Sequence, residues 1–317
     1  MKTIYLHIGV AKTGTTSIQQ FLSCNKQALV ALGYNYLHSD DGGLGLGHQH
    51  FAKSFIVEYP YFMEPADNPE CIKKAIRTDI ISSSSNKIVI SSENFGLASP
   101  EGIKKFFLDI IPDCQFKIIL FVRSQDELAE SGYNQLVKIK RETRSFHDHF
   151  ELAYNLGWYD FFALSQKWAN TFGDEAVVAN VFDASKGLAI TQILTSIGIM
   201  SDEFHKFNFE KKMTNAAVGY KVLNRYRFLN KIEIENRQKV YADIFEKSKG
   251  NDFPALMFDS QDGERYRGRY AASNKAFSAK YLTSEIDDFG GLRYGDHERN
   301  TIRTKISNLI LPELVST

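Results

Sequence analysis

The chain has 317 residues, of which 43% are hydrophobic, so it can bury the core of one elaborate α/β domain or of two smaller ones. Its 38 basic and 38 acidic residues cancel, which argues against the broad positive field of a general nucleic-acid binder. The sequence shows neither a secretory signal nor an apolar run long enough to span a membrane. Its 3 cysteines are isolated and suggest no zinc site or disulfide framework, so we expect a cytoplasmic protein.

The N-terminal part of the chain has the pattern strand, loop, helix. Residues 3–8 alternate and are rich in β-formers, and an apolar stripe at helical spacing runs from Ile18 to Leu32. Residues 39–50 are rich in glycine and polar side chains and predict a long surface loop, followed by a weaker helical segment over residues 71–82.

The rest of the chain alternates between short apolar runs and helical periods. We predict strands at 87–91, 116–122 and 176–182, and helices at 100–111, 158–172, 187–197, 216–246 and 272–282. Residues 250–269 are polar and basic without a clear period. This alternation predicts an α/β fold with a central parallel sheet flanked by helices. We expect one domain over residues 1–317, mostly helical from about residue 200 onward.

The sequence HIGVAKTGTTSIQQFL, residues 7–22, resembles a nucleotide-binding loop with a displaced lysine. Gly9 and Gly14 keep the usual glycine spacing, but Thr15 stands at the lysine position and Lys12 lies inside the loop. A strand, a glycine loop and a helix together direct backbone N–H groups and a positive helix end at one anion. Lys12 would add a full charge. The alternative is an ordinary tight turn with a solvated lysine.

The residue order in this loop disfavours ATP. An ATP site uses a hydroxyl directly after the loop lysine, together with an acidic residue, to hold magnesium. That lysine and hydroxyl pair is absent here in the required order. A transferred group with less charge than a terminal phosphate, such as a sulfuryl group, could be bound by Lys12 and backbone donors without a metal.

A second anion-binding signal lies in FVRSQDELAESGYNQ, residues 121–135. Arg123 follows an apolar strand, and Ser124 to Glu127 has the form of a helix capping box. Helical side chains lean toward the N-terminus, so Ser131 can point back toward Arg123 and the two could hold one phosphate. The alternative is a surface arginine with an incidental helix serine.

These two segments resemble the sulfotransferases that use 3′-phosphoadenosine 5′-phosphosulfate. Residues 7–22 are similar to that family's 5′-phosphosulfate loop, and residues 122–135 to its 3′-phosphate element, with the same separation of Arg123 and Ser131. TNAAVGYKVLNRYRFLN and RYAASNKAFSAKYL resemble segments of bacterial carbohydrate sulfotransferases. The resemblance implies a P-loop-like three-layer fold, the phosphosulfate donor, the product 3′,5′-ADP and no required metal.

The resemblance also assigns donor contacts to individual residues. It implies that the 5′-phosphosulfate is bound by Lys12, Thr13, Gly14, Thr15, Thr16 and Ser17, and the 3′-phosphate by Arg123 and Ser131. Many members close a glycine-rich basic loop over the nucleotide. The nearest candidate here is RYRGR, residues 265–269, with Arg267 as a donor contact; the alternative is a solvated basic turn.

Transfer to a hydroxyl needs a base and charge stabilisation on the leaving phosphate oxygen. Lys12 is the candidate for stabilisation. Glu93 directly follows a predicted strand, at the sheet edge where such folds bind ligands, and a glutamate is the base in several carbohydrate sulfotransferases. Glu93 could instead be a capping or ion-paired carboxylate. His48 is the second candidate base, beside His50 in the glycine-rich loop, where H-x-H is a weak metal signal. His7, on the first strand, could be a core residue.

The acceptor is expected to be a carbohydrate or glycolipid. Candidate aromatic contacts are Tyr61, Phe62, Phe95, Tyr133, Trp158 and Tyr159. Two alternatives remain: a P-loop kinase or other nucleotide phosphotransferase, and a non-catalytic nucleotide- or glycan-binding module. No nucleic-acid partner or integral membrane segment is expected, and the sequence leaves the oligomeric state open.

Overall fold

The computed structural model describes residues 1–38, 46–139, 142–183, 187–210, 218–248, 254–282 and 298–304. The chain divides into two compact units. Unit 1 comprises Met1–Arg123, Phe161–Thr214 and Ser273–Gly291; unit 2 comprises Ser124–Asp160, Asn215–Ala272 and Leu292–Thr317. The chain therefore leaves unit 1 and returns to it. This division into compact units does not test the expectation of a single domain, which stays a prediction.

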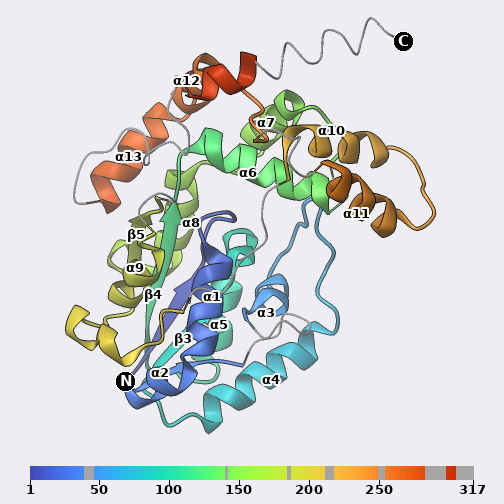
Figure 1. Cartoon of the computed structure of the whole chain (residues 1–317). Helices are drawn as coiled ribbons and strands as arrows, with labels where there is room; N and C mark the ends of the chain where they lie inside the picture. Colours follow the sequence, from blue (N-terminus) through green and yellow to red (C-terminus); the bar gives the residue numbers. More distant parts are fainter. Residues whose placement is uncertain are drawn as a thin grey trace, which may run out of the picture. The chain divides into compact units, whose positions relative to one another are not determined.

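Unit 1 contains a five-stranded parallel sheet with the order β2-β3-β1-β4-β5 (Figure 1). The strands are β1 (Lys2–His7), β2 (Tyr34–Tyr36), β3 (Lys87–Ser91), β4 (Cys114–Val122) and β5 (Val177–Val181). Four of them confirm the predicted strands. Strand β2 was not predicted, because its three residues are too few to show a period.

Helices cover both faces of the sheet in unit 1. They are α1 (Thr15–Cys24), α2 (Lys26–Ala31), α3 (Gln49–Lys53), α4 (Pro69–Ser82), α5 (Pro100–Leu108), α8 (Phe161–Phe172) and α9 (Ala189–Ser196), with α13 (Ala271–Tyr281) beginning at the boundary with unit 2. Short 3₁₀ helices are η1 (Glu93–Leu97), η2 (Asp174–Ala176) and η3 (Ser201–Lys206). None of the helices in the described ranges is long and apolar enough to cross a membrane.

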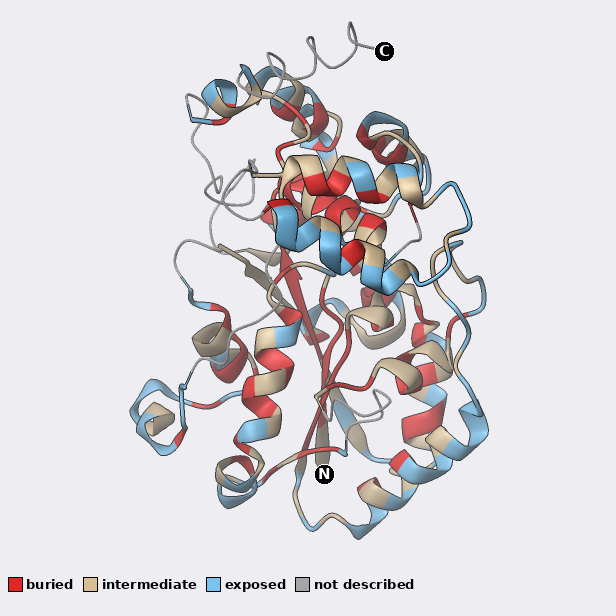
Figure 2. Cartoon of the chain, turned by 45° about the vertical axis from the view of Figure 1, so that its right-hand side comes forward, coloured by how far each residue is buried: buried red, intermediate tan, exposed pale blue. Residues whose placement is uncertain are grey.

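The core fills both sides of the sheet, and the central strands are largely buried (Figure 2). On one face Val89 and Phe121 belong to a cluster with Leu22 of α1 and Ile193 of α9. On the other face β4 meets α5 and α8, where the Phe116 ring lies 4.7 Å from that of Phe172. The predicted three-layer, P-loop-like α/β fold is confirmed.

The first predicted helical stripe is two helices rather than one. Asn25 ends α1, and its side-chain amide donates to the carbonyls of Phe21 and Asn208 at 3.0 Å each. The N–H of Asn208 in turn donates to Asn25 Oδ1 at 2.8 Å. A side chain bonded to both segments favours a turn over helix continuation at this position.

Unit 2 is helical, and two sequence predictions there were wrong. Its helices include α6 (Gln125–Lys138), α7 (Phe146–Asn155), α10 (Tyr220–Leu229), α11 (Arg237–Ser248) and α12 (Ser260–Gly268), and residues 298–304 are helical as well. The single helix predicted over 216–246 is α10 and α11, separated at Asn236 with φ of 53°. Residues 216, 217 and 250–253 lie outside the described residues. Helix α12 was not predicted because its polar sequence hides the period, although Asp259 caps it through the N–H of Asp262.

Leu22 tests the packing of the α1 layer. Leu22→Ala removes a side chain that is 0% exposed. We expect the free energy of unfolding to fall by about 3 kcal/mol because a cavity is left behind. Val30→Ala on α2, where valine is 56% exposed, is the control and should cost less than about 0.5 kcal/mol. Urea denaturation measures both, and equal losses would contradict the assigned core.

Candidate functional site

The glycine loop between β1 and α1 is held in a tight backbone conformation. Gly9, Lys12 and Gly14 have φ of 36°, 71° and 80°. A Cβ added at Gly9 would lie 2.8 Å from Thr15 Cγ2, and one added at Gly14 would lie 2.7 Å from Phe182 Cε2. Larger residues would therefore collide at both positions, and glycine allows the loop to close around the start of α1.

The start of α1 is an N-terminus without a side-chain cap. Gly14 is the N-cap residue, no side chain caps it, and the N–H of Ile18 makes the first helical bond to Gly14 at 3.0 Å. The preceding N–H groups of the first turn have no intrahelical acceptor, so they are available to an anion. Thr13 and Thr15 are buried, while Thr16 is exposed. The Thr13 hydroxyl donates to the Val10 carbonyl at 2.6 Å, which ties the loop together.

The neighbouring strands place opposite charges on the two sides of this loop. Glu93 follows β3, and its Cα lies 3.7 Å from the Cβ position of Gly9. Arg123 follows β4, and its guanidinium donates to the Lys12 carbonyl at 3.3 Å. The same guanidinium lies 5.6 Å from the ring centroid of Phe182, just after β5. The Arg123 side chain thus lies beside the Lys12 backbone, and Glu93 lies beside Gly9, at the carboxyl edge of the sheet; the functional roles of these residues stay predictions.

The carboxylate of Glu93 is held by two glutamines. Its Oε2 atom accepts from Gln19 Nε2 at 3.1 Å and from Gln49 Nε2 at 3.0 Å. Gln19 lies on α1 and Gln49 on α3. Neither glutamine was predicted from the sequence, although Gln19 lies near the start of α1, directly after the glycine loop. The alternative of a capping role for Glu93 does not apply, because Ser92 is the cap of η1.

His48 is buried in the core rather than exposed on a surface loop. It is 0% exposed and sits at the N-cap position of α3. Its Nδ1 accepts from the Ser91 N–H at 3.2 Å and its Nε2 lies 3.3 Å from the Leu37 carbonyl. Burial lowers the pKa of His48 to about 4. With both ring nitrogens bonded to backbone, His48 has a structural role, and this corrects its placement as a base. Residues 39–45 of the predicted loop lie outside the described residues.

His7 is also a core residue, as one reading of the sequence allowed. Its Nδ1 lies 2.8 Å from Ser91 Oγ, and its ring packs edge-on against Phe121. Its Nε2 is buried and lies 3.3 Å from the Cβ position of Gly9. Burial lowers the pKa of His7 to about 3, so the ring is neutral at pH 7. His50, the remaining candidate, lies on α3 and is partly buried.

The structure separates the candidate aromatic contacts into core and surface residues. Phe95 is 0% exposed against Phe51, and Tyr133 is 2% exposed with its hydroxyl donating to the Arg144 carbonyl. Both are packing residues in their own units, and Tyr159 is buried as well. Tyr61 remains 45% exposed, and its ring contacts that of Phe62.

The second predicted anion element differs from expectation in two ways. Ser124 is the N-cap residue of α6 but makes no capping bond; its hydroxyl donates to Asp126, so the predicted capping box was wrong. Arg267 lies on α12 rather than in a loop, and its guanidinium pairs with buried Asp126. Arg123 belongs to unit 1 and Ser131 to unit 2, so their joint phosphate contact stays a prediction.

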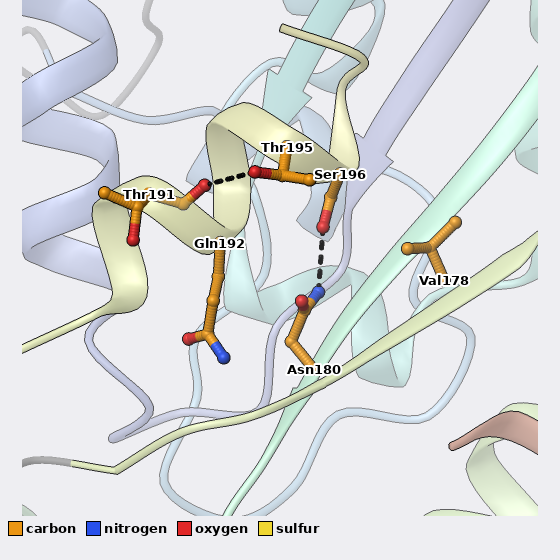
Figure 3. Close-up of a pocket in the computed structure, with 6 residues that line it drawn as sticks. All are labelled: Val178, Asn180, Thr191, Gln192, Thr195 and Ser196. Atoms are coloured by element: carbon orange, nitrogen blue, oxygen red, sulfur yellow. Dashed lines mark hydrogen bonds between the residues drawn. The ribbon is translucent and has the colours of Figure 1, made fainter. Parts of the chain in front are cut away.

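A separate hollow lies between β5 and α9 (Figure 3). Val178 and Asn180 of β5 line it together with four polar residues of α9, Thr191, Gln192, Thr195 and Ser196. The Asn180 amide donates to Ser196 Oγ at 3.0 Å across it. No predicted site residue lines this hollow, so we place the candidate site at the glycine loop. Across the described ranges, no group of three His, Cys, Asp or Glu side chains forms a metal site.

Comparison with known proteins gives distant similarities. No protein-family model matches the chain. An uncharacterized protein of Archaeoglobus fulgidus is 23% identical over 203 residues, 62% of this chain and 54% of that protein, so the match spans about half the relative's length. The crystal structure of a sulfotransferase from Alicyclobacillus acidocaldarius is 17% identical with a TM-score of 0.43, over 77% of this chain and 92% of that one. The functional interpretation therefore depends on the residues of the site itself.

The two buried histidines make stability depend on pH. Because burial lowers the pKa of His7 and His48 to about 3 and about 4, the unfolded chain binds protons below pH about 6.5 that the folded chain does not. The free energy of unfolding should fall between pH 6.5 and 4 by about 1.4 kcal/mol per pH unit for each histidine. We expect the free energy of unfolding of His48→Gln, measured by denaturation at several pH values, to depend less steeply on pH. The difference in slope should correspond to one proton fewer. The exposed His205→Gln is the control, and an unchanged His48→Gln slope would refute the assignment.

Arg267 tests whether α12 is anchored by a buried ion pair. Asp126 is 0% exposed and Arg267 is 17% exposed, so Arg267→Leu should lower the free energy of unfolding by about 3 kcal/mol by leaving a buried charge unpaired. The double variant Asp126→Asn/Arg267→Leu should recover much of this loss. Arg265→Leu on the same helix, whose arginine pairs with Asp262 at the surface, should cost at most about 1 kcal/mol. Equal losses in urea denaturation for both single arginine variants would contradict the anchoring role.

Proposed function

We propose that this protein is a sulfotransferase that acts in the cytoplasm and transfers a sulfuryl group from 3′-phosphoadenosine 5′-phosphosulfate to a hydroxyl of a carbohydrate or glycolipid. The observation that carries this proposal is the arrangement of one sheet edge in unit 1. There the glycine loop with Lys12 lies between Glu93 and Arg123. The resemblance of residues 7–22 and 122–135 to the sulfotransferase donor elements supports the same assignment.

The donor set of the loop fits a phosphosulfate. Gly9 and Gly14 leave no space for a Cβ against Thr15 and Phe182, so the loop keeps its tight turn into α1. The first turn of α1 offers N–H groups and the positive end of the helix. In the proposed complex Lys12 and this turn, with Thr15, Thr16 and Ser17, bind the 5′-phosphosulfate. Arg123, together with Ser131, binds the 3′-phosphate.

The same residues supply the chemistry that the transfer needs. The donor provides a sulfuryl group whose bond to the phosphate oxygen breaks as the acceptor oxygen bonds to sulfur, with the electron pair staying on that phosphate oxygen. Glu93 accepts the proton of the acceptor hydroxyl, and Lys12 neutralises charge on the departing phosphate oxygen. This assignment asks nothing of a metal ion, because Lys12 and the N–H groups of the first turn of α1 would supply the positive charge around the anion.

Donor binding and transfer should respond to different residues. Lys12→Ala and Arg123→Ala should weaken binding of 3′,5′-ADP and reduce transfer by about 100-fold or more, because each removes a charge-assisted contact. Glu93→Gln should keep the 3′,5′-ADP affinity within about twofold and lower kcat by about 100-fold, because only the base is lost. Calorimetry measures the affinity for 3′,5′-ADP. Transfer is measured by offering labelled donor to an extract of the producing cell and identifying the product by mass.

Controls and outcomes separate the rival activities. Lys105→Ala, whose lysine is 75% exposed on α5, should leave binding and transfer unchanged. Normal turnover by Glu93→Gln would remove it as the base. Magnesium-dependent ATP consumption without affinity for 3′,5′-ADP would instead assign a kinase. Tight donor binding with no transfer to any hydroxyl acceptor would assign a binding module.

A further inference from the structure

We propose that Gln19 and Gln49 are positioning residues that hold the Glu93 carboxylate by one oxygen, Oε2, and present its other oxygen, Oε1, to the acceptor hydroxyl. This inference deepens the proposed function and rests on it. Both amides donate to Oε2, at 3.1 Å from Gln19 and 3.0 Å from Gln49, and neither of these bonds uses Oε1. Two donors on one oxygen fix the rotation of a carboxylate that a single bond would leave free.

The orientation of the Gln49 amide is determined by its other partners. The Ser92 hydroxyl donates to Gln49 Oε1 at 2.5 Å, and Ser92 Oγ accepts from the N–H of Asn94 at 3.1 Å. An ionised carboxylate can only accept, so of the two Gln49 amide atoms only the nitrogen can bond to Glu93 Oε2. The amide oxygen therefore faces Ser92, and the NH₂ group faces Glu93. Gln49 Nε2 also donates to Gln19 Oε1 over a long 3.5 Å and so links the two glutamines.

Gln19 connects this network to the donor loop. It lies on α1, the helix whose first turn faces the proposed phosphosulfate, and it is only 4% exposed. Gly47 packs directly on its amide, since a Cβ at Gly47 would lie 2.8 Å from Gln19 Cδ. The side chain is thus confined between the loop before α3 and Glu93. Helix α1 therefore positions both the backbone N–H groups proposed to bind the anion and the Gln19 amide that orients the Glu93 carboxylate.

This arrangement has a defined consequence for the transfer step. The proton of the acceptor hydroxyl moves to Glu93 Oε1 while the acceptor oxygen bonds to sulfur and the bond between sulfur and the phosphate oxygen breaks. Hydrogen bonds from two neutral amides to Oε2 fix the orientation of the carboxylate and leave Oε1 as the oxygen that meets the acceptor hydroxyl. Removal of either amide should lower the rate of the chemical step and leave donor binding intact.

A double-mutant cycle tests whether the glutamines act through Glu93. Gln49→Leu and Gln19→Leu should each lower kcat by about 10- to 100-fold, with the KM for donor and the Kd for 3′,5′-ADP within about twofold of wild type. In the Glu93→Gln background the same substitutions should change the residual rate by less than about twofold, because the group they position is gone. Gln20→Leu, one residue further along α1, is the matched control and should behave as wild type.

The outcomes distinguish this inference from the proposed function. Equal fold-losses in the wild-type and Glu93→Gln backgrounds, or glutamine variants with wild-type kcat, would overturn the positioning role while sulfuryl transfer by the wild type stands. If the wild type transfers to no acceptor, the proposed function fails and this inference fails with it. Should Gln49→Leu not fold, as judged by its 3′,5′-ADP binding, Gln49→Met, which keeps the chain length without the amide, is measured instead and decides the same question.

Discussion

The site depends on parallel hydrogen bonding of β1 to both of its neighbours. His7 pairs in register with Ser91 of β3 and with Ile119 of β4, so the three strands end close together at one edge. Only a parallel arrangement brings the glycine loop, Glu93 and Arg123 to the same edge of the sheet. Glu93 and Arg123 then lie on opposite sides of the loop, because β3 and β4 flank β1. Helices on both faces keep these strands buried and their register fixed. The core thus positions the candidate site residues Lys12, Glu93 and Arg123, which follow β1, β3 and β4.

The sequence predicted what is encoded locally. The strand, glycine loop and helix at the start of the chain form a short continuous pattern, as does the strand at 116–122. The structure contains both. Helix α12 escaped prediction because its buried face is reduced to Gly263 and Tyr266. Asn25 and Asn236 divide predicted helices through side-chain bonds or backbone conformation that hydrophobic periodicity does not register.

What the sequence could not supply were partners far along the chain. His48 lies 43 residues from Ser91, and its glycine-rich surroundings gave no sign that it returns to the sheet. The Gln19 and Gln49 amides lie 74 and 44 residues from Glu93. A glutamine has no chemical signature comparable with a loop lysine. Its role becomes visible only when the fold shows which carboxylate it meets.

The conformation of Lys12 shows what the chain gives up for this loop. Of the described non-glycine residues, Lys12, Asn68 and Asn236 have positive φ, and asparagine tolerates that region far better than lysine does. For folding alone, glycine or asparagine at position 12 would save about 1 kcal/mol. The folded chain therefore carries a small penalty for having a lysine at this position. A search for more stable sequences on this backbone would replace that lysine early, and under the proposed function the gain in melting temperature would come with a loss of donor binding.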